Sequence, residues 1–318
     1  MYWQSGSLLG LDTSAASASY SGVIADPNGV SIGLAKLGGN TLTLSGSNSY
    51  SGPTTINSGV LQAVDGVGLP AASNLVFNGN LAQNGTGAVL QSSGMFSRSV
   101  GSGPGQVQWT GDGGFAANGG PLTVSMSPGV PLVWSSVYNS NGTPGFLGDL
   151  NTLTFGSPTA NSQVNLTDSV DLNGPNQNGG NRQIYVAAGT GGDSALISGD
   201  IIDSAGGAGL TKAGGGLLIL AGTDTYTGGT TVEEGTLIVT NNAALPAGSS
   251  LTVGAGGTFV FDPAASGSSI GSDSFQNPHT SVVVEAVPEP GTLALLLVAM
   301  GNVIFYLRPS FGRNSLER

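Results

Sequence analysis

The sequence predicts an all-β chain, a parallel β-helix (solenoid) of short stacked strands, followed by a C-terminal hydrophobic helix. Three observations predict it: a composition rich in turn residues, an internal repeat with a shorter spacing inside it, and an abrupt change of character near the C-terminus. Of 318 residues, 55 are glycine, 39% are hydrophobic and only 8% are charged. Val, Ile, Leu and Thr favour strands, while Gly and Asn favour turns, so we expect many short strands and few helices.

The charge pattern excludes several classes of function. The net charge is -11, and the only basic residues before residue 288 are Lys36, Arg98, Arg182 and Lys212, each isolated in the sequence. Binding to nucleic acid needs clustered Lys and Arg to neutralise phosphates, so we expect no nucleic-acid partner. The chain has no cysteine, which excludes disulfides, thiol catalysis and thiolate metal sites.

An internal repeat is the strongest structural signal. Residues 33–75 align without a gap to residues 209–251 at a constant offset of 176, with 19 identities over 43 positions. The alignment keeps Lys36 with Lys212 and Tyr50 with Tyr226, which chance similarity of two glycine-rich stretches would not do. We therefore interpret these segments as two copies of one structural unit.

A shorter spacing inside each copy predicts the coil. Leu42 to Leu61 is a step of 19 residues, as is Ile56 to Leu75, and the second copy repeats both steps. A coil of about 20 residues with two or three short strands pairs its backbone with the next coil, about 4.8 Å away. The expected product is a parallel β-helix over residues 1–262.

Several residues of the repeat have expected roles within such a coil. Four equivalent glycines should occupy corners that other residues enter only with strain: Gly46, Gly52, Gly222 and Gly228. We expect Tyr50 and Tyr226 to cap a corner rather than bind a sugar. We expect Lys36 and Lys212 to be solvated or paired with a carboxylate.

The segment between the two copies has the same pattern of short apolar runs separated by turn residues, so we expect one continuous array. Six further short strands are predicted, around Leu122–Val124, Leu132–Trp134, Leu153–Phe155, Val164–Leu166, Ile184–Val186 and Ala195–Ile197. The glycine-rich stretches that begin at Gly101 and Asn173 are expected to be projecting loops, where binding specificity would lie.

A family resemblance follows from the repeat. The pattern G-L-x-K-x-G-G-x-x-L-x-L-x-G-x-x-x-Y-x-G-x-T-T, which begins at Gly33 and again at Gly209, resembles the autotransporter-associated β-strand repeat of bacterial surface passengers. The resemblance covers two segments of 43 residues each. It implies a right-handed β-helical passenger, and no catalytic residue comes with the motif.

The C-terminus has a different character. Residues 263–286 are expected to be a linker. An apolar run, Leu293–Leu307, predicts a transmembrane helix over residues 292–307 or so. That run is about 22 Å long against a hydrocarbon core of about 30 Å, a mismatch that a transient anchor would tolerate. A motif precedes the run and a basic flank follows it: Val287, Pro288, Glu289 and Pro290, then Arg308, Arg313 and Arg318. The arginines favour a cytoplasmic end, with the acidic body outside.

This tail, residues 287–318, resembles the PEP-CTERM sorting signal. The resemblance implies recognition by a membrane-embedded exosortase, cleavage near Pro288–Pro290, and release or attachment of the body at the cell surface, often in organisms that make exopolysaccharide. A plain C-terminal anchor is the alternative. Because Met1–Gly6 lacks a basic and apolar secretion signal, we expect the N-terminus to be incomplete.

The sequence offers little for catalysis. His279 is the only histidine and lies in the expected linker, so no Ser-His-Asp triad or histidine metal cluster can form in the array. Carboxylate chemistry remains open, with three candidate pairs: Asp168 with Asp171, Asp200 with Asp203, and Glu233 with Glu234. Calcium could use Asp193 with Asp200 and Asp203, but a turn-forming role is favoured for these residues. We expect no catalytic, cofactor-binding or metal-binding residue.

Two hypotheses about function follow. The preferred one is an exported, non-enzymatic structural or adhesive protein of the cell surface or extracellular matrix, anchored transiently by its C-terminal helix, with exopolysaccharide or matrix as a partner. The alternative is a polysaccharide-active hydrolase or lyase on the same scaffold. A catalytic groove would draw its aromatic walls from Trp3, Trp109 and Trp134, although core packing or capping is the favoured role for each.

Overall fold

The structure is a computed structural model that describes residues 2–85, 87–134, 146–174, 179–262 and 282–285. The chain divides into two units, Met1–Ala286 and Val287–Arg318, and every described residue belongs to the first. The predicted sorting signal (287–318), its apolar helix and most of the predicted linker (263–286) therefore lie outside the described residues.

The described residues are almost entirely strands and turns, arranged in three sheets. The five-stranded sheet has the spatial order β1 (Ser7–Asp12), β3 (Ile32–Leu37), β5 (Thr54–Ile56), β7 (Leu75–Phe77) and β9 (Val107–Trp109). The 14-stranded sheet contains β2 (Ala18–Tyr20), β4 (Thr41–Leu44), β6 (Gly59–Ala63), β8 (Ala88–Ser97), β10 (Gly113–Ser125), β12 (Leu153–Phe155), β13 (Gln163–Leu166), β15 (Gly180–Val186), β16 (Ser194–Ile197), β18 (Ala208–Ala213), β19 (Leu217–Leu220), β20 (Thr230–Val239), β21 (Leu251–Phe261) and β22 (Val282–Glu285). The three-stranded sheet contains β11 (Leu132–Val133), β14 (Val170–Asp171) and β17 (Ile201–Ile202). The helical elements of the described residues are the single turns α1 (Leu81–Asn84) and η1 (Pro27–Gly29).

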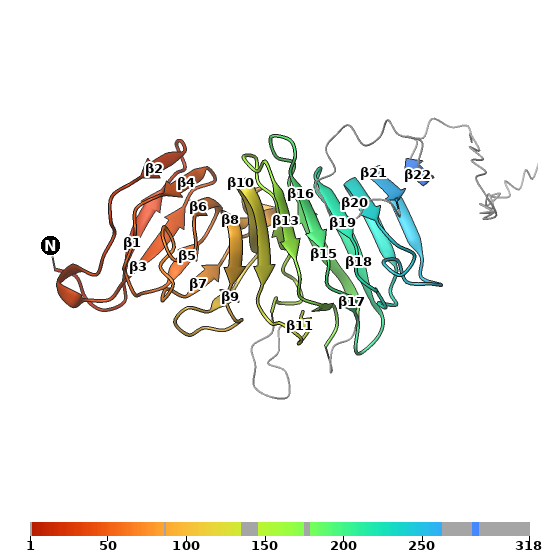
Figure 1. Ribbon diagram of the computed structural model, residues 1–318, viewed down its shortest axis with the longest axis horizontal. Helices are drawn as coiled ribbons and strands as arrows, with labels where there is room; N and C mark the ends of the chain where they lie inside the picture. Colours follow the sequence, from red (N-terminus) through yellow and green to blue (C-terminus); the bar gives the residue numbers. More distant parts are fainter. Residues whose placement is uncertain (1, 86, 135–145, 175–178, 263–281, 286–318) are drawn as a thin grey trace, which may run out of the picture. The chain divides into compact units, whose positions relative to one another are not determined.

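Parallel pairing dominates the three sheets, as the sequence predicts, and the strands follow one another in Figure 1 from β1 to β21. From β3 to β8 the chain alternates between two sheets, placing one strand in the five-stranded sheet and the next in the 14-stranded sheet. All six strands predicted between the repeat copies are present as β10, β11, β12, β13, β15 and β16. The all-β expectation with parallel strands is confirmed.

The predicted spacing is right for one ladder and wrong for the other. Leu42 pairs with Leu61, and Leu218 pairs with Leu237, which are the predicted steps of 19 residues. Leu75, however, pairs with Thr54 rather than with Ile56, and the second copy repeats this shift. The turn that follows β6, closed by hydrogen bonds from Val67 N and Leu69 N to Val64 O, lengthens that part of the coil.

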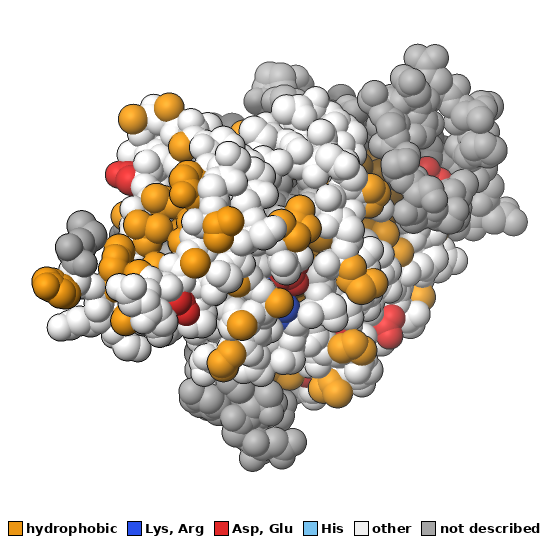
Figure 2. All heavy atoms as spheres, turned by 60° about the vertical axis from the view of Figure 1, so that its left-hand side comes forward, with side chains coloured by type: hydrophobic (Ala, Val, Ile, Leu, Met, Phe, Trp, Pro, Cys, Tyr) orange, Lys and Arg blue, Asp and Glu red, His pale blue; other side chains and the backbone are white. Residues whose placement is uncertain are grey.

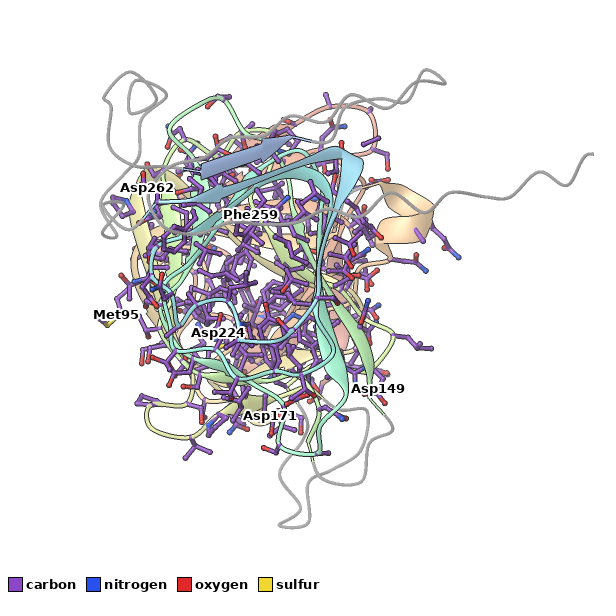
Figure 3. All side chains as sticks on the ribbon, turned by 90° about the vertical axis from the view of Figure 1, so that its right-hand side faces the viewer. Met95, Asp149, Asp171, Asp224, Phe259 and Asp262 are labelled. Atoms are coloured by element: carbon purple, nitrogen blue, oxygen red, sulfur yellow. The ribbon has the colours of Figure 1, made fainter. Side chains whose placement is uncertain are left out.

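The core is a continuous column of apolar side chains enclosed by the sheets, as Figure 3 shows in a view along the stack of strands. Paired residues of successive strands supply it: Leu42, Leu61 and Leu90 are in register and are at most 3% exposed. In the second copy Leu218, Leu237 and Phe259 form the equivalent row. Each strand therefore buries its inward side chains beside those of the strands that pair with it, which stabilises the sheets.

The four glycines expected at corners are required for a different reason than predicted. None of Gly46, Gly52, Gly222 and Gly228 has the left-handed φ that the expectation assumed. Instead, the backbone of the neighbouring coil passes so close that a Cβ would overlap it; at Gly52 a Cβ would lie 2.5 Å from the Ile32 carbonyl oxygen. These glycines permit close approach of successive coils.

The last described strand breaks the parallel pattern. β22 (Val282–Glu285) lies within the range expected as a linker, and it pairs antiparallel with β21. Phe261 of β21 pairs with Val282, and Thr258 pairs with Glu285. The 14-stranded sheet is thus extended past residue 262 by a strand of opposite direction.

Candidate functional site

A buried lysine is the most distinctive feature of each repeat copy. Lys36 is fully buried, and its Nζ donates hydrogen bonds to the carbonyl oxygens of Leu37, Gly38 and Ser58 at 3.0, 2.6 and 2.9 Å. Lys212 is also fully buried and donates to the three equivalent carbonyl oxygens at 2.9, 2.5 and 2.9 Å. The expectation of a solvated or carboxylate-paired lysine is wrong for both residues.

The charge of these lysines is retained at neutral pH. Burial lowers the pKa of Lys36 and of Lys212 to about 8, while the carboxylates of Asp12 and Glu234 raise the respective values. Three carbonyl acceptors around one Nζ require three N–H donors, which only the ammonium form supplies. Each ammonium group therefore joins its own turn to the next coil.

Glycine makes this arrangement possible. Gly38 and Gly214, which supply one of the three carbonyls in each copy, have φ of 76° and 74°. This left-handed conformation is accessible to glycine without steric cost. The two Lys-x-Gly segments of the repeat are thus explained by one local structure.

A buried tyrosine is the second shared feature. Tyr50 and Tyr226 are at most 1% exposed and lie in the core, so neither is placed to contact a sugar. The Tyr50 hydroxyl lies 2.7 Å from Thr54 Oγ1, which lies 2.8 Å from Ser73 Oγ in the next coil. Burial raises the pKa of Tyr50 to about 12, so this hydroxyl stays protonated at physiological pH.

Replacing Tyr50 by phenylalanine tests this chain of hydroxyls. The variant Tyr50→Phe should lose about 1 kcal/mol of unfolding free energy, because one buried hydrogen bond is lost while the ring still fills the core. Urea denaturation measures the loss. Tyr20→Phe is the matched control, since Tyr20 is 46% exposed and should tolerate the change. Equal stability of Tyr50→Phe and wild type would contradict the assigned role.

Aspartates connect coils in both halves of the array. Asp203 Oδ2 accepts hydrogen bonds from Ala208 N, Thr227 N and Thr227 Oγ1 at 3.0, 3.1 and 2.8 Å. Before the first copy, Asp26 accepts similar bonds from Ser51 N and Ser51 Oγ at 3.2 and 2.7 Å. A carboxylate that accepts several backbone and hydroxyl hydrogens fixes the loop it sits on.

The first candidate carboxylate pair also binds backbone. Asp168 accepts from Met126 N and Ser127 N at 2.5 and 3.0 Å, and Asp171 accepts from Ser204 N at 3.0 Å. Both aspartates are buried. Their oxygens are engaged in joining neighbouring coils.

The remaining candidate carboxylates do not form a cluster. Asp200 accepts from Thr223 N at 2.7 Å, and Asp193 accepts from the amide of Gly189 in its own turn at 2.8 Å. Glu233 and Glu234 are both exposed on β20. Among the described residues, no group of three or more His, Asp or Glu side chains is close enough together to hold a metal ion.

All three tryptophans pack in or against the apolar core. Trp134 is fully buried, and its Nε1 donates to Gly148 O at 3.1 Å. Trp109 is half-buried against Phe146, with ring centroids 4.6 Å apart. Trp3 lies at the N-terminal end, where it lines a pocket.

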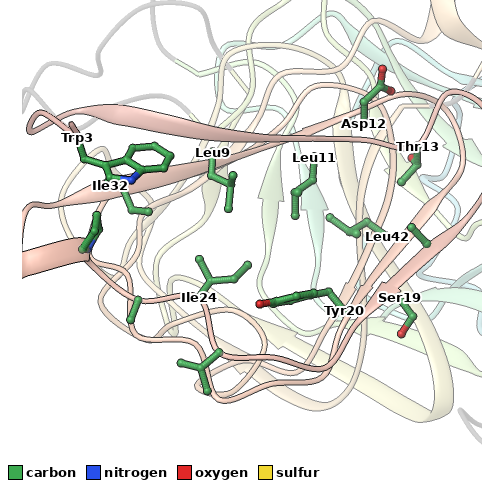
Figure 4. Close-up of a pocket in the computed structure, with 14 residues that line it drawn as sticks. Trp3, Leu9, Leu11, Asp12, Thr13, Ser19, Tyr20, Ile24, Ile32 and Leu42 are labelled. Carbon is green, nitrogen blue, oxygen red and sulfur yellow. The ribbon is translucent and has the colours of Figure 1, made fainter. Parts of the chain in front are cut away.

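That pocket is an apolar cavity of about 550 Å³ at the first coil, shown in Figure 4. Leu9, Leu11, Ile24 and Tyr20 line it, and Asp12 lies at its edge. β1 and β2 are the first strands of their sheets, so the apolar interior reaches the surface here. Figure 2 shows hydrophobic side chains gathered on this end of the described residues.

Two buried arginines were missed as structural elements by the sequence analysis. Arg98 is 5% exposed, pairs with Asp65 and donates to Pro70 O at 2.9 Å. Arg182 is 4% exposed and pairs with Asp149 at 3.1 Å. The sequence offered one signal for this role: each arginine stands alone in a chain with few charges. A cation that is buried needs a specific partner.

The predicted sorting residues cannot be placed. Val287, Pro288, Glu289 and Pro290, with Arg308, Arg313 and Arg318, lie outside the described residues, as does His279. Within the part of the chain that the structure describes, no helix is long and apolar enough to cross a membrane.

The fold is all-β, and its two repeat copies are the segments in which a known repeat family is matched. Residues 34–63 and 210–239 match the family model of the passenger-associated-transport-repeat, and they contain the buried lysines and tyrosines. The chain is similar to the adhesin BmaC autotransporter of Brucella suis biovar 1 (strain 1330), with 29% identity over 239 residues, which is 65% of this chain. The match spans 7% of that relative's length. No solved structure gives a significant match.

Proposed function

We propose that the chain is an exported, surface-associated adhesive protein whose body is a right-handed parallel β-helix. The observation that carries this proposal is the coincidence of the two passenger-associated repeats with stacked parallel strands. The name of the similar protein, an adhesin autotransporter, supports an adhesive role.

The solenoid path is supported by the order of the strands. From β3 to β8 the chain places one strand in each of two sheets in turn, and each of these strands pairs in parallel with the strand two further along the chain. Parallel neighbours need a crossover connection, and here the crossover is the intervening strand of the other sheet. This arrangement supports the proposed β-helix.

The charge of the surface indicates the chemistry of the partner. All four basic side chains of the body are buried: Lys36, Arg98, Arg182 and Lys212. The described surface therefore has acidic side chains among its polar and apolar ones, but no Lys or Arg. An anionic partner would find no opposite charge on it, so the partner that fits is a neutral polysaccharide or matrix component bound through hydrogen bonds.

Binding to polymer films tests this function. The full chain is passed over films of a neutral glucan and of a polyuronate, at low and high salt, with the heat-unfolded chain as control. We expect retention of the folded chain on the neutral film, with little change between the two salt concentrations, because no ion pair is involved. Retention on the polyuronate alone, or on neither film, would contradict the proposal.

We also propose that an exosortase-type enzyme processes the tail near Pro288–Pro290 while the apolar segment holds the protein at the membrane. The order of motif, apolar run and arginines supports this proposal. In a host that has the enzyme, the mass of the mature protein should correspond to a C-terminus near the motif. Glu289→Ala or loss of the enzyme should leave the full tail, whereas an unprocessed tail in every strain would indicate a plain anchor.

A further inference from the structure

Asp224 is a buried carboxyl group with an unusual environment near the last coils, where Figure 3 labels it. Asp224 is only 5% exposed, and its Oδ1 accepts a hydrogen bond from Ile201 N at 2.8 Å. Its Oδ2 is buried and has no hydrogen-bond partner among the described residues. A buried carboxylate oxygen without a donor is costly.

The first repeat copy shows what this position requires. Asn48 aligns with Asp224; its Oδ1 accepts from Ile24 N at 2.8 Å, and its Nδ2 donates to Gly68 O at 2.8 Å. The position therefore needs one acceptor and one donor. A carboxyl group meets both needs only in its protonated form, with one oxygen accepting and the O–H donating.

The two copies share a backbone hydrogen bond at this position. Asp224 N donates to Ala243 O, as Asn48 N donates to Val67 O in the first copy. Ala244 follows Ala243 and aligns with Gly68, so its carbonyl corresponds to the acceptor used by Asn48 Nδ2.

The charged groups near Asp224 also favour its neutral form. The pKa of Asp224 is raised to about 7, mainly by burial and also by the negative charge of Asp200, while the hydrogen bond from Ile201 N opposes the rise. Tyr226 remains neutral, since burial raises its pKa above the ordinary value. The covering segment 241–250 contains no titratable side chain.

We propose that Asp224 is held as a neutral carboxylic acid whose O–H donates to Ala244 O, and that its ionisation loosens the segment 241–250 from the coil beneath. The last coils of the array then form a pH-sensitive element. The first copy, with Asn48 in the same position, is insensitive to pH at this point.

The sign of the effect follows from the two protonation equilibria. Below the ordinary value of 3.8, both the folded and the unfolded chain hold the proton. Between 3.8 and about 7 the folded chain keeps a proton that the unfolded chain has lost, so stability falls as pH rises. Within this pH range the ionisation of Asp224 raises the unfolding constant about tenfold per pH unit, and the increase levels off above about pH 7.

The test compares the full chain with Asp224→Asn from pH 4 to 8.5, by urea denaturation. The ratio of the two unfolding constants isolates this group from the other carboxylates. We expect Asp224→Asn to gain stability over wild type as pH rises, with a plateau above about pH 7. The matched variant Asn48→Asp should introduce the same dependence in the first copy, with the opposite sign relative to wild type.

Two readouts on the wild-type chain do not depend on the folding of a variant. Hydrogen exchange of the peptide 241–250, corrected for the intrinsic pH dependence, should speed up between pH 5 and 8. Infrared spectra at pH 6 should contain the carbonyl band of a buried carboxylic acid. A ratio of unfolding constants that is independent of pH, or unchanged exchange of this segment, would overturn the proposal.

Discussion

Replacing Lys212 by methionine should lower the free energy of unfolding by about 3 kcal/mol, because three hydrogen bonds from a buried ammonium to backbone carbonyls are lost. Methionine fills much of the same volume and supplies no donor. Relief from burying a charge offsets part of the loss, so the net effect is smaller than three separate bonds would suggest. Thermal or urea denaturation of the full chain measures it.

The equivalent change in the first copy should have a similar cost. Lys36→Met removes three hydrogen bonds of the same type. Glu233→Gln is the matched control, since its side chain is exposed on β20, and we expect less than about 0.5 kcal/mol. If both lysine variants unfold like this control, the ammonium groups do not stabilise the coils.

Replacing Gly228 by alanine should cost about 2 to 3 kcal/mol, because a Cβ would lie 2.5 Å from both the carbonyl carbon of Ala208 and the amide nitrogen of Gly209 in the neighbouring coil. Both contacts are with backbone, which can yield only if the coils separate. Denaturation by urea again gives the cost.

Gly215→Ala is the matched control for this prediction. Its Cβ would meet only Glu234 Oε1, at 3.8 Å, and its φ lies outside the left-handed region, so stability should be unchanged or slightly raised. Two alanine variants with equal stability would mean that close approach of the coils is not the reason for Gly228.

The strands could be predicted from the sequence because their signal is local. The steps from Leu42 to Leu61 and from Leu218 to Leu237 are pairings in the structure, since residues that face one core recur once per coil. The step from Ile56 to Leu75 was wrong because the turn after β6 adds length that apolar periodicity does not reveal. Spacing predicts that coils stack, but the turns set the register.

The roles of the shared polar residues could not be predicted in the same way. A lysine is normally exposed, and the carbonyls that surround Lys36 come from its own turn and from Ser58 in the next coil. Only the folded chain brings these groups together. The aligned copies show that Asp224 replaces Asn48, but the sequence does not show what this difference does. Its effect depends on the hydrogen bond from Asn48 Nδ2 to Gly68 O, which Asp224 Oδ2 lacks in the second copy.

The parallel stacking of coils can be tested directly by cross-linking, since the natural chain has no cysteine. Thr43 of β4 pairs with Gln62 of β6, and both side chains are half-buried. Neighbouring strands are about 4.8 Å apart, a separation that suits a disulfide. Oxidation of the Thr43→Cys, Gln62→Cys double variant should link it rapidly. The Thr41→Cys, Gln62→Cys variant, shifted by two residues, should link much more slowly. Equal rates for the two variants, or no link in the first, would contradict a stack of parallel coils.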